Sequence, residues 1–465
     1  MTTRQQARLD VPPAQFLNLF AEFQAVSWDG WRKVLGRLTP GVREFYAIVG
    51  RGAGKSRIVS ALAACFAARE YGLVPGENVY IGVFAPDRKQ AGVTFRYIVG
   101  LMKSVPVLEA LIVAEAKDSI ELSNGVIIEV MTASTAAPRG RGYALVIVEE
   151  AAFLPADESA NPDVELLRAL RPALARVPGS LLAVISSPYA RKGVLFSAWS
   201  KHHGNPDGDV VVVQASTQEL NPAFNQQAIA RAYDDDPIAA AAEYGAQFRS
   251  DVESLFSLDG VRACVVAGRR ELPPLRKVHY RAFVDPSGGS ADSFTLAIVH
   301  AKKGQLILDA IRERRPPFSP DAVVQEFAAL LKSYRITKVT GDRYGGEWPR
   351  ERFRAHGITY EPCSKSKSDL YLSLLPALNS GRVELLEHDK MVNQLAGLER
   401  RTARGGRDSV DHAPGSHDDV ANAVAGALAT AGESRQGPRI RLLFRPSDDL
   451  LNVGDWRTVP LDDDD

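Results

Sequence analysis

The sequence predicts an α/β protein with two successive domains, each built around a sheet of its own. The chain has 465 residues, and at about 100–200 residues per domain this length predicts two or three domains. In residues 1–250, and again from residue 279 onward, short apolar runs alternate with stretches of good helix formers. The runs of the first half lack polar alternation, which is typical of strands buried on both faces of a mostly parallel sheet.

The composition excludes several classes of protein. Hydrophobic residues make up 45% of the chain and charged residues 24%, which excludes a disordered or low-complexity chain. The 56 Lys and Arg residues are balanced by 56 Asp and Glu residues, so the formal net charge is +0. Binding of nucleic acid through bulk charge is therefore excluded, and any contact with DNA must be local.

The cysteines and the apolar runs bear on the cellular compartment. Cys65, Cys264 and Cys363 are too far apart in the sequence to form a CxxC metal site or a disulfide framework. No run of about 18 uncharged apolar residues is present, and residues 1–13 lack the apolar core of a signal peptide. The sequence therefore predicts a cytosolic protein that does not span a membrane.

The first domain is expected to cover residues 1–250. Its expected strands are the apolar runs at residues 45–49, 79–84, 126–131, 145–148, 181–185 and 210–213. Helices are expected at residues 57–71, which are rich in alanine, and at residues 164–175. Residues 221–250 are expected to be wholly helical, so about 215–250 is interpreted as a helical lid.

The second domain is expected to cover residues 251–435, with the boundary around residues 250–275, where the sequence includes the prolines of residues 271–275. Three adjacent strands, a helix and a fourth strand are expected at residues 279–284, 295–300, 305–311, 321–334 and 338–341. A late, alanine-rich helix is expected at residues 420–431. Residues 436–465 carry seven acidic and four basic residues, and they are interpreted as an acidic, solvated tail.

A phosphate-binding loop is expected directly after the first strand, where a helix begins. Its residues, which are the expected ATP-binding residues, are Gly50, Arg51, Gly52, Ala53, Gly54, Lys55 and Ser56. Glycines let the backbone N–H groups turn toward an anion at the helix N-terminus. Lys55 would reach the β- and γ-phosphates, and the Ser56 hydroxyl would bind Mg²⁺. The pattern GxxxxGK[ST] departs from its strict form at Val49, where its first glycine would stand.

Two acids follow the strand at residues 145–148 and complete the expected ATPase site. Glu149 is expected to act through Mg²⁺, and Glu150 is expected to polarise the water that attacks the γ-phosphate. After the next strand, Ser186-Ser187-Pro188 stands where a loop would sense the γ-phosphate. The phosphate loop and the paired acids support each other, because neither would be specific alone.

Two arginines precede the acidic strand in a loop rich in glycine. Arg139 or Arg141 is a candidate arginine finger, which would neutralise charge on the nucleotide of a neighbouring subunit. The alternative is that both are solvated loop residues. The sequence leaves the two interpretations about equal.

A second site is expected from acids at separate elements of the second domain. Asp285 ends the first strand, Asp342 ends the fourth, and Asp418 and Asp419 precede the late helix. Carboxylates placed in this order can converge on two Mg²⁺ or Mn²⁺ ions, the arrangement that cuts phosphodiester bonds. Asp292 is either an accessory acid or a turn residue.

These two constellations together resemble the large terminase subunit of tailed double-stranded DNA bacteriophages and their prophages, over about residues 20–432. The resemblance implies a P-loop ATPase domain of the ASCE, RecA-like type followed by an RNase H-like nuclease domain. In that family the first glycine of the loop is often missing, as at Val49, and the acid pair is commonly Asp-Glu rather than Glu149-Glu150. The family's trans-acting arginine falls at Arg139 or Arg141, and its coupling tripeptide at residues 186–188.

The resemblance also implies a biological role. Such a protein would bind concatemeric double-stranded DNA with a small terminase subunit, cut it, and pump it through the portal protein into a procapsid using ATP. It would act as a homo-oligomeric ring, commonly a pentamer, and as a monomer in free solution. It would reside in the host cytoplasm, transiently at the portal vertex, and would be absent from the mature virion. The resemblance does not decide between Asp418 and Asp419 as the metal ligand.

Two alternatives remain open from the sequence. A DNA-repair helicase-nuclease would also join an ATPase to metal-binding carboxylates, but a second RecA-like lobe would need about 150–200 further residues. A nucleotide-switched assembly factor with a vestigial nuclease is the other alternative, and Glu149 in place of an aspartate is compatible with it.

Overall fold

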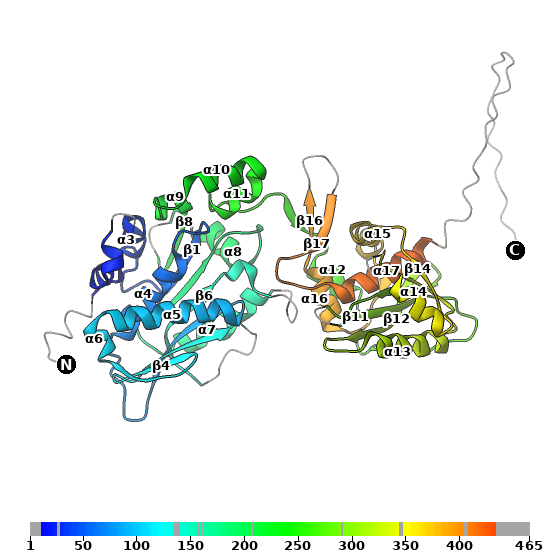
Figure 1. Ribbon diagram of the computed structural model, residues 1–465, viewed down its shortest axis with the longest axis horizontal. Coiled ribbons are helices and arrows are strands. Elements are labelled where there is room, and N and C mark those ends of the chain that lie inside the picture. The colour runs from blue at the N-terminus through cyan, green and yellow to red at the C-terminus, as the bar shows by residue number, and fades with distance from the viewer. Residues whose placement is uncertain are drawn as a thin grey trace, which may run out of the picture.

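A computed structural model describes residues 11–25, 28–133, 140–155, 159, 161–205, 208–289, 292–343, 347–402 and 408–433. Two α/β bodies follow each other along the chain, and each has a separate sheet (Figure 1). The tail at residues 436–465 lies outside the described residues. Within the described part of the chain, no helix combines the length and apolarity that a membrane span requires.

The first sheet has eight strands in the order β3-β4-β5-β2-β6-β7-β1-β8. Six are parallel: β1 (Glu44–Val49), β2 (Val79–Ala85), β5 (Val126–Thr132), β6 (Tyr143–Glu149), β7 (Leu181–Ser186) and β8 (Val210–Ala215). All six were expected from their apolar runs. The antiparallel strands β3 (Ile112–Glu115) and β4 (Ser119–Leu122) were missed, because both are short, partly exposed and carry polar residues, and β3 is the edge strand.

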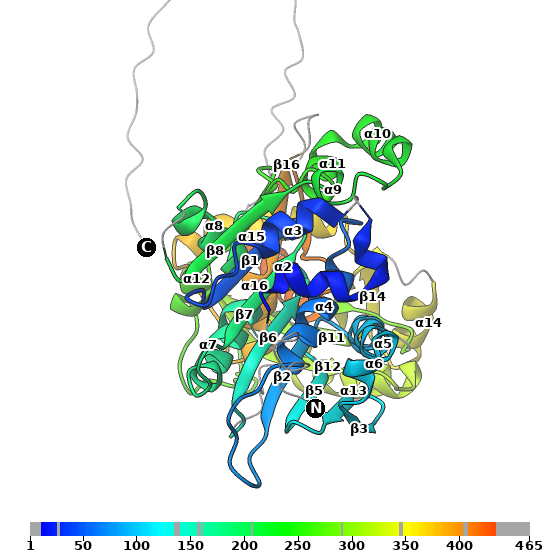
Figure 2. The same cartoon turned by 90° about the vertical axis from the view of Figure 1, so that its left-hand side faces the viewer.

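Helices cover both faces of this sheet, as the view onto the first domain shows (Figure 2). One face carries α4 (Lys55–Ala67), α5 (Arg88–Ser104) and the N-terminal elements α2 (Pro13–Phe16) and α3 (Asp29–Leu35). The other carries α7 (Pro162–Leu174) and α8 (Gly193–His202). Alternate residues of β1 point into the two cores, with Ala47 in one and Ile48 in the other.

The expected continuous helix over residues 221–250 is wrong. The chain instead forms α9 (Thr217–Leu220), α10 (Gln226–Asp235) and α11 (Pro237–Glu243), and it is not helical after Tyr244. Pro237 forces Asp236 into an extended conformation, which ends α10, and the Asp236 side chain then caps α11. Ala246 adopts a left-handed conformation with φ of 55°, which also does not continue a helix.

The strand order confirms the expected class of the first domain. Strand β1, which leads into the glycine-rich loop, is separated from the acidic strand β6 by one intervening strand, β7. This additional strand defines the ASCE, RecA-like type of P-loop domain. Because all three strands are parallel, the loop and the acids end at the same edge of the sheet.

The second sheet has six strands in the order β14-β13-β10-β11-β12-β15. They are β10 (Tyr280–Asp285), β11 (Phe294–Lys302), β12 (Gln305–Arg314), β13 (Lys338–Gly341), β14 (Thr359–Pro362) and β15 (Val383–Glu384). The first three form an antiparallel meander, and β13 and β14 lie parallel to β10 on its other side. This is the strand order of the RNase H fold, so the expected class of the second domain is confirmed.

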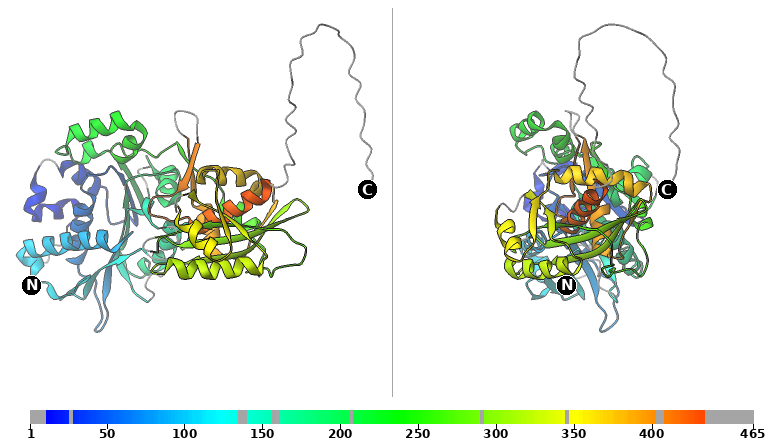
Figure 3. Two further views of the ribbon diagram at one scale, coloured as in Figure 1. Left: turned by 45° about the vertical axis from the view of Figure 1, so that its right-hand side comes forward. Right: turned by 90° about the vertical axis from the view of Figure 1, so that its right-hand side faces the viewer.

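Two helical layers enclose this second sheet (Figure 3). Helices α13 (Pro320–Ser333) and α14 (Trp348–Ala355) pack on one face, and α12 (Leu258–Ala263), α15 (Lys367–Asn379), α16 (Asp389–Ala396) and α17 (Asp419–Glu433) pack on the other. Gly426 of α17 lies directly on the sheet, since a Cβ there would come within 2.4 Å of the Phe283 ring. This close approach fixes the height of α17 above β10.

A small third sheet lies at the junction of the two bodies (Figure 1). Its strands are β9 (Val252–Ser254), β16 (Leu398–Thr402) and β17 (Asp408–His412), in the order β17-β16-β9. Glu399 of β16 is fully buried and accepts hydrogen bonds from the Tyr189 hydroxyl at 2.6 Å and from Lys192 Nζ at 2.8 Å. Since Tyr189 and Lys192 come from the first domain, this carboxylate joins the two domains.

Candidate active sites

The glycine-rich loop is held open by side chains that bind its carbonyl groups. The Trp31 indole, the Thr217 hydroxyl and the Asn221 amide donate to the carbonyl oxygens of residues 53, 51 and 52, at 2.6, 2.8 and 2.9 Å. Gly52 and Gly54 have φ of 79° and 90°, which only glycine adopts without strain. The loop therefore turns its carbonyls away from the start of α4, as a phosphate cradle requires.

Position 50 requires glycine because there is no room for a side chain. A Cβ at this position would lie 2.2 Å from the Thr217 hydroxyl oxygen and 2.6 Å from the Tyr244 carbonyl oxygen. Both contacts come from the segments around α9 and α11. The lid helices thus lie against the first turn of the loop, which explains glycine at position 50 although Val49 replaces the usual first glycine.

The Lys55 ammonium lies between the ends of strands β6 and β7. Its Nζ is 3.1 Å from Glu150 Oε1 and donates a hydrogen bond to Ser187 Oγ at 2.7 Å. The structure thereby brings together three residues that the sequence singled out in three separate motifs. The charge of the lysine is matched by the carboxylate that is expected to activate water.

Glu149 lies at the end of β6 and is buried. It accepts a hydrogen bond from the Thr94 hydroxyl at 2.6 Å. Burial raises the pKa of Glu149 to about 7, and repulsion from Glu150 adds to the shift, while hydrogen bonds from Thr94 and Ser56 oppose it. The carboxyl and the Ser56 hydroxyl are neighbouring oxygen donors, so this pair fits the chemistry of a bound Mg²⁺.

Glu150 has an unusual backbone conformation. Its φ of 47° and ψ of 46° lie in the left-handed region, which costs a non-glycine residue free energy. Its Oε2 accepts hydrogen bonds from the Ser186 hydroxyl at 3.1 Å and from the Ser187 backbone N–H at 3.3 Å. The tripeptide after β7 therefore holds the carboxylate expected to activate water.

One of the two candidate finger arginines, Arg141, lies among the described residues. Arg141 stands two residues before β6, so it lies near the opposite end of that strand from Glu149. Its guanidinium is bonded to Glu129 and lies 4.9 Å from the centre of the Tyr80 ring. Arg141 is thus remote from the nucleotide edge of its own subunit, and Arg139 lies outside the described residues.

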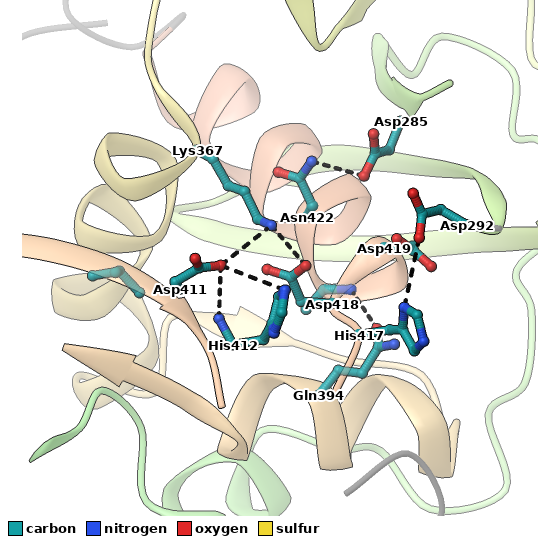
Figure 4. Close-up of polar contacts among 12 residues, drawn as sticks. Asp285, Asp292, Lys367, Gln394, Asp411, His412, His417, Asp418, Asp419 and Asn422 are labelled. Carbon is teal, nitrogen blue, oxygen red and sulfur yellow. Dashed lines mark hydrogen bonds and ion pairs between the residues drawn. The ribbon is translucent and has the colours of Figure 1, made fainter. Parts of the chain in front are cut away.

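The second site is a cavity of about 720 Å³ at the carboxyl ends of β10 and β13. These strands are parallel neighbours, with Val284 opposite Gly341, so Asp285 and Asp342 reach the same edge. Asp419, the first residue of α17, lines the same cavity. Figure 4 shows Asp285 and Asp419 approaching it from the sheet and the helix.

The charges of this cavity favour a cation. Burial raises the pKa of Asp285 to about 8, and the charges of Asp419, Asp342 and Asp418 add to the shift, against a hydrogen bond from Asn422. A divalent ion would relieve this repulsion, and oxygen donors suit Mg²⁺ or Mn²⁺. Within the described ranges, no three acidic, His or Cys side chains are clustered around one ion position.

The structure separates Asp418 from Asp419. Asp418 is buried behind the cavity, where it pairs with Lys367 Nζ at 2.7 Å and accepts a hydrogen bond from the Tyr371 hydroxyl at 2.7 Å. Asp419 instead lines the cavity. Asp292 lies at its rim, 3.7 Å from His417. Lys367 also lines the cavity, and neither it nor Tyr371 carries a sequence signal, because both depend on the packing of α15 against α17.

Asn422 is a further cavity residue that the sequence analysis missed. It stands three residues after Asp419, so the helical period places both on one face, and this spacing was the available signal. Its Nδ2 donates to Asp285 Oδ2 at 2.8 Å, while its Oδ1 is buried without a hydrogen-bond partner among the described residues. Gln394 of α16 fixes this helix by accepting from the N–H groups of Val420 and Ala421, both at 3.0 Å.

Replacing Asn422 by alanine is expected to lower metal-dependent DNA cutting by about 10- to 100-fold, the usual effect of losing a group that orients a metal ligand. The carboxylate of Asp285 would lose its only neutral donor in the cavity wall described here. Initial rates of plasmid nicking, measured against Mn²⁺ concentration, check this. Gln394→Ala is the matched comparison, because it removes the hydrogen bonds that hold the start of α17 and should therefore also lower the melting temperature. Unchanged nicking by Asn422→Ala would contradict the role assigned to Asn422.

No protein-family model and no curated protein matches this chain. Among solved structures, it is similar to the HK97 bacteriophage large terminase at 16% identity, covering 86% of this chain and 94% of that chain with a TM-score of 0.39. It is also similar to the large terminase of a thermophilic bacteriophage, at 11% identity, with 87% and 97% covered and a TM-score of 0.38.

The second domain has a separate similarity. The large terminase nuclease of thermophilic phage G20c with bound magnesium is 20% identical, covering 38% of this chain and 96% of that chain, with a TM-score of 0.34. The solved structures named here are thus large terminases or their nuclease domains, the family that the motifs resemble. The functional conclusion rests on the geometry of the two sites themselves.

Proposed function

We propose that this protein is the ATPase and endonuclease of a bacteriophage DNA-packaging motor. The observation that carries the proposal is the presence of two distinct phosphate-chemistry sites in one chain. A phosphate cradle with Lys55 and Glu150 ends one sheet, and a cavity of carboxylates ends the other. Packaging requires both activities, because DNA has to be translocated with ATP and cut at the start and end of translocation.

The ATPase step follows from the contacts of Lys55. Phosphates of a bound ATP would compete with Glu150 for the lysine ammonium, and Lys55 would then pair with the β- and γ-phosphates. Release from Lys55 would leave the Glu150 side chain held by Ser186 and Ser187, where it can accept a proton from the attacking water. Mg²⁺, held near Ser56 and Glu149, would neutralise charge that develops on the phosphates.

The cutting step follows from the acidic cavity. Asp285, Asp342 and Asp419 would hold two Mg²⁺ or Mn²⁺ ions, which activate the attacking water and stabilise the leaving oxygen. Asn422 would keep the Asp285 carboxylate in position. Lys367, already paired with Asp418, lies at the wall where the DNA backbone would pass, so its ammonium can bind a phosphate.

The partners and the cellular site belong to the same proposal. The motor would bind double-stranded DNA, a small terminase subunit and the portal protein of a procapsid, and it would act as a pentameric ring. It would be found in the host cytoplasm and transiently at the portal vertex, not in the mature virion. A finger arginine acting across the ring would be Arg139, or Arg141 after release from Glu129.

The direct test uses the purified full-length protein with plasmid DNA and Mn²⁺, Mg²⁺ or EDTA, with ATP turnover measured in the same preparation. We expect nicking or linearisation with either metal, no cutting in EDTA, and ATP hydrolysis that requires Mg²⁺. ATP hydrolysis without cutting under any metal would favour a nucleotide-driven assembly factor with a vestigial nuclease. Absence of both activities would contradict the proposal.

A further inference from the structure

The cavity beside Glu150 is lined by residues of both domains. Its volume is about 640 Å³, and its walls include Glu150 and Ser187 from the first domain and Arg401, Pro414 and Gly415 from the second. Ser187 also holds the Lys55 ammonium. The side of the ATP site where the terminal phosphate would lie therefore faces strand β16.

Two other arginines of this cavity are already neutralised. Arg249 donates two hydrogen bonds to Asp251, at 3.0 and 2.6 Å. Arg51, which is largely exposed, lies 3.4 Å from Glu243. Each of these guanidinium groups would have to give up a carboxylate before it could bind a phosphate.

Arg401 differs because its charge is poorly matched. Its Nε is buried without a hydrogen-bond partner among the described residues, and its Nη2 donates to the neutral Tyr189 hydroxyl at 3.3 Å. Its nearest carboxylate is Glu399, at 3.8 Å, and that group is already bound to Lys192 and Tyr189. The Arg401 side chain is 35% exposed and lines the cavity, so its guanidinium can bind an anion that enters there.

We propose that Arg401 binds the terminal phosphate of a nucleoside triphosphate within its own chain, so that the second domain completes the ATP site. The proposal rests on the ATPase function proposed above. A cation on this side would stabilise negative charge that develops on the γ-phosphate as its bond to the leaving oxygen breaks. Arg141, which is bonded to Glu129 at the far end of β6, does not offer such a group in the same subunit.

The test compares the affinities of the full-length protein for a non-hydrolysable ATP analogue and for ADP, each with Mg²⁺. Arg401→Ala is expected to lower the affinity for the triphosphate analogue by about tenfold and to change the affinity for ADP by no more than about twofold, because only the triphosphate carries the γ-phosphate. Its kcat for ATP hydrolysis should fall by about 100-fold, at protein concentrations where the wild type is monomeric. Arg401→Lys should restore part of both values.

Arg400→Ala is the matched control, since Arg400 is the preceding residue of β16, points to the opposite face, and pairs with Asp408 at 2.7 Å. It should leave both affinities unchanged. Equal weakening of ATP and ADP by Arg401→Ala, or no change in either, would overturn the assignment and leave Arg401 as an interface residue. If the wild type hydrolyses no more ATP than the Lys55→Ala variant, the proposed ATPase function itself would be overturned.

Discussion

Lys55→Ala is expected to lower ATP hydrolysis by at least about 10³-fold, because the variant loses the ammonium that would bind the β- and γ-phosphates. Glu150→Gln should lower turnover comparably through a different cause. Its amide cannot accept a proton from water, although it can still accept hydrogen bonds from Ser186 and Ser187. Nucleotide affinity should therefore fall in Lys55→Ala and should be kept in Glu150→Gln.

Phosphate release at saturating ATP and equilibrium binding of a labelled nucleotide measure these two effects. DNA cutting by the same variants is the internal control, because the acidic cavity is built from β10, β13 and α17 without any residue of the first sheet. Cutting in Mn²⁺ should be retained in both variants. A Lys55→Ala protein with normal turnover would show that the loop does not bind the reacting phosphates.

Asp285→Asn and Asp342→Asn are expected to lower metal-dependent cutting by at least about 100-fold while ATP hydrolysis is retained. Each variant loses one negatively charged metal ligand. The loss of a few kcal/mol of transition-state stabilisation by the metal ions corresponds to a rate decrease of about 100-fold or more. In EDTA, Asp285→Asn should be at least as stable as the wild type, since burial among three other acids already disfavours the Asp285 carboxylate.

Plasmid nicking and thermal unfolding in EDTA check the two parts of this prediction. Glu326→Gln is the matched control, because this acid lies on α13 of the same domain and pairs with Arg314 away from the cavity. It should cut DNA at the wild-type rate. Cutting that survives in both aspartate variants would place the nuclease site elsewhere in the chain.

Much of the fold could be predicted from the sequence, because buried parallel strands appear in the sequence as uninterrupted apolar runs. The same reasoning found most of both sites. Residues that follow parallel strands of one sheet meet at the same edge, so Glu149 and Glu150 were expected near the loop, and Asp285 near Asp342. These placements require only that the strands concerned are parallel, which the helical segments between them in the sequence indicate.

The rest depended on packing between distant segments. The choice of Asp419 over Asp418 follows from Lys367 and Tyr371 of α15, which bind Asp418 behind the cavity. Arg141 was one of two candidate fingers for a neighbouring subunit's nucleotide, and its place just before β6 puts it at the far end of that strand from Glu149 and Glu150 of its own subunit. Arg401 and Arg51 belong to different domains and lie far apart in the sequence, yet both line one cavity.

The fully buried Glu399 limits how the two domains can move during a work cycle. Its charge is compensated by Lys192 and Tyr189, which come from the first domain. Hinge opening at this junction would break the hydrogen bonds that Lys192 and Tyr189 donate to this carboxylate and would replace them by contacts with water, which costs free energy. We therefore expect the domains of one subunit to turn as a single rigid lever, with any large stroke arising from the lid or between neighbouring subunits.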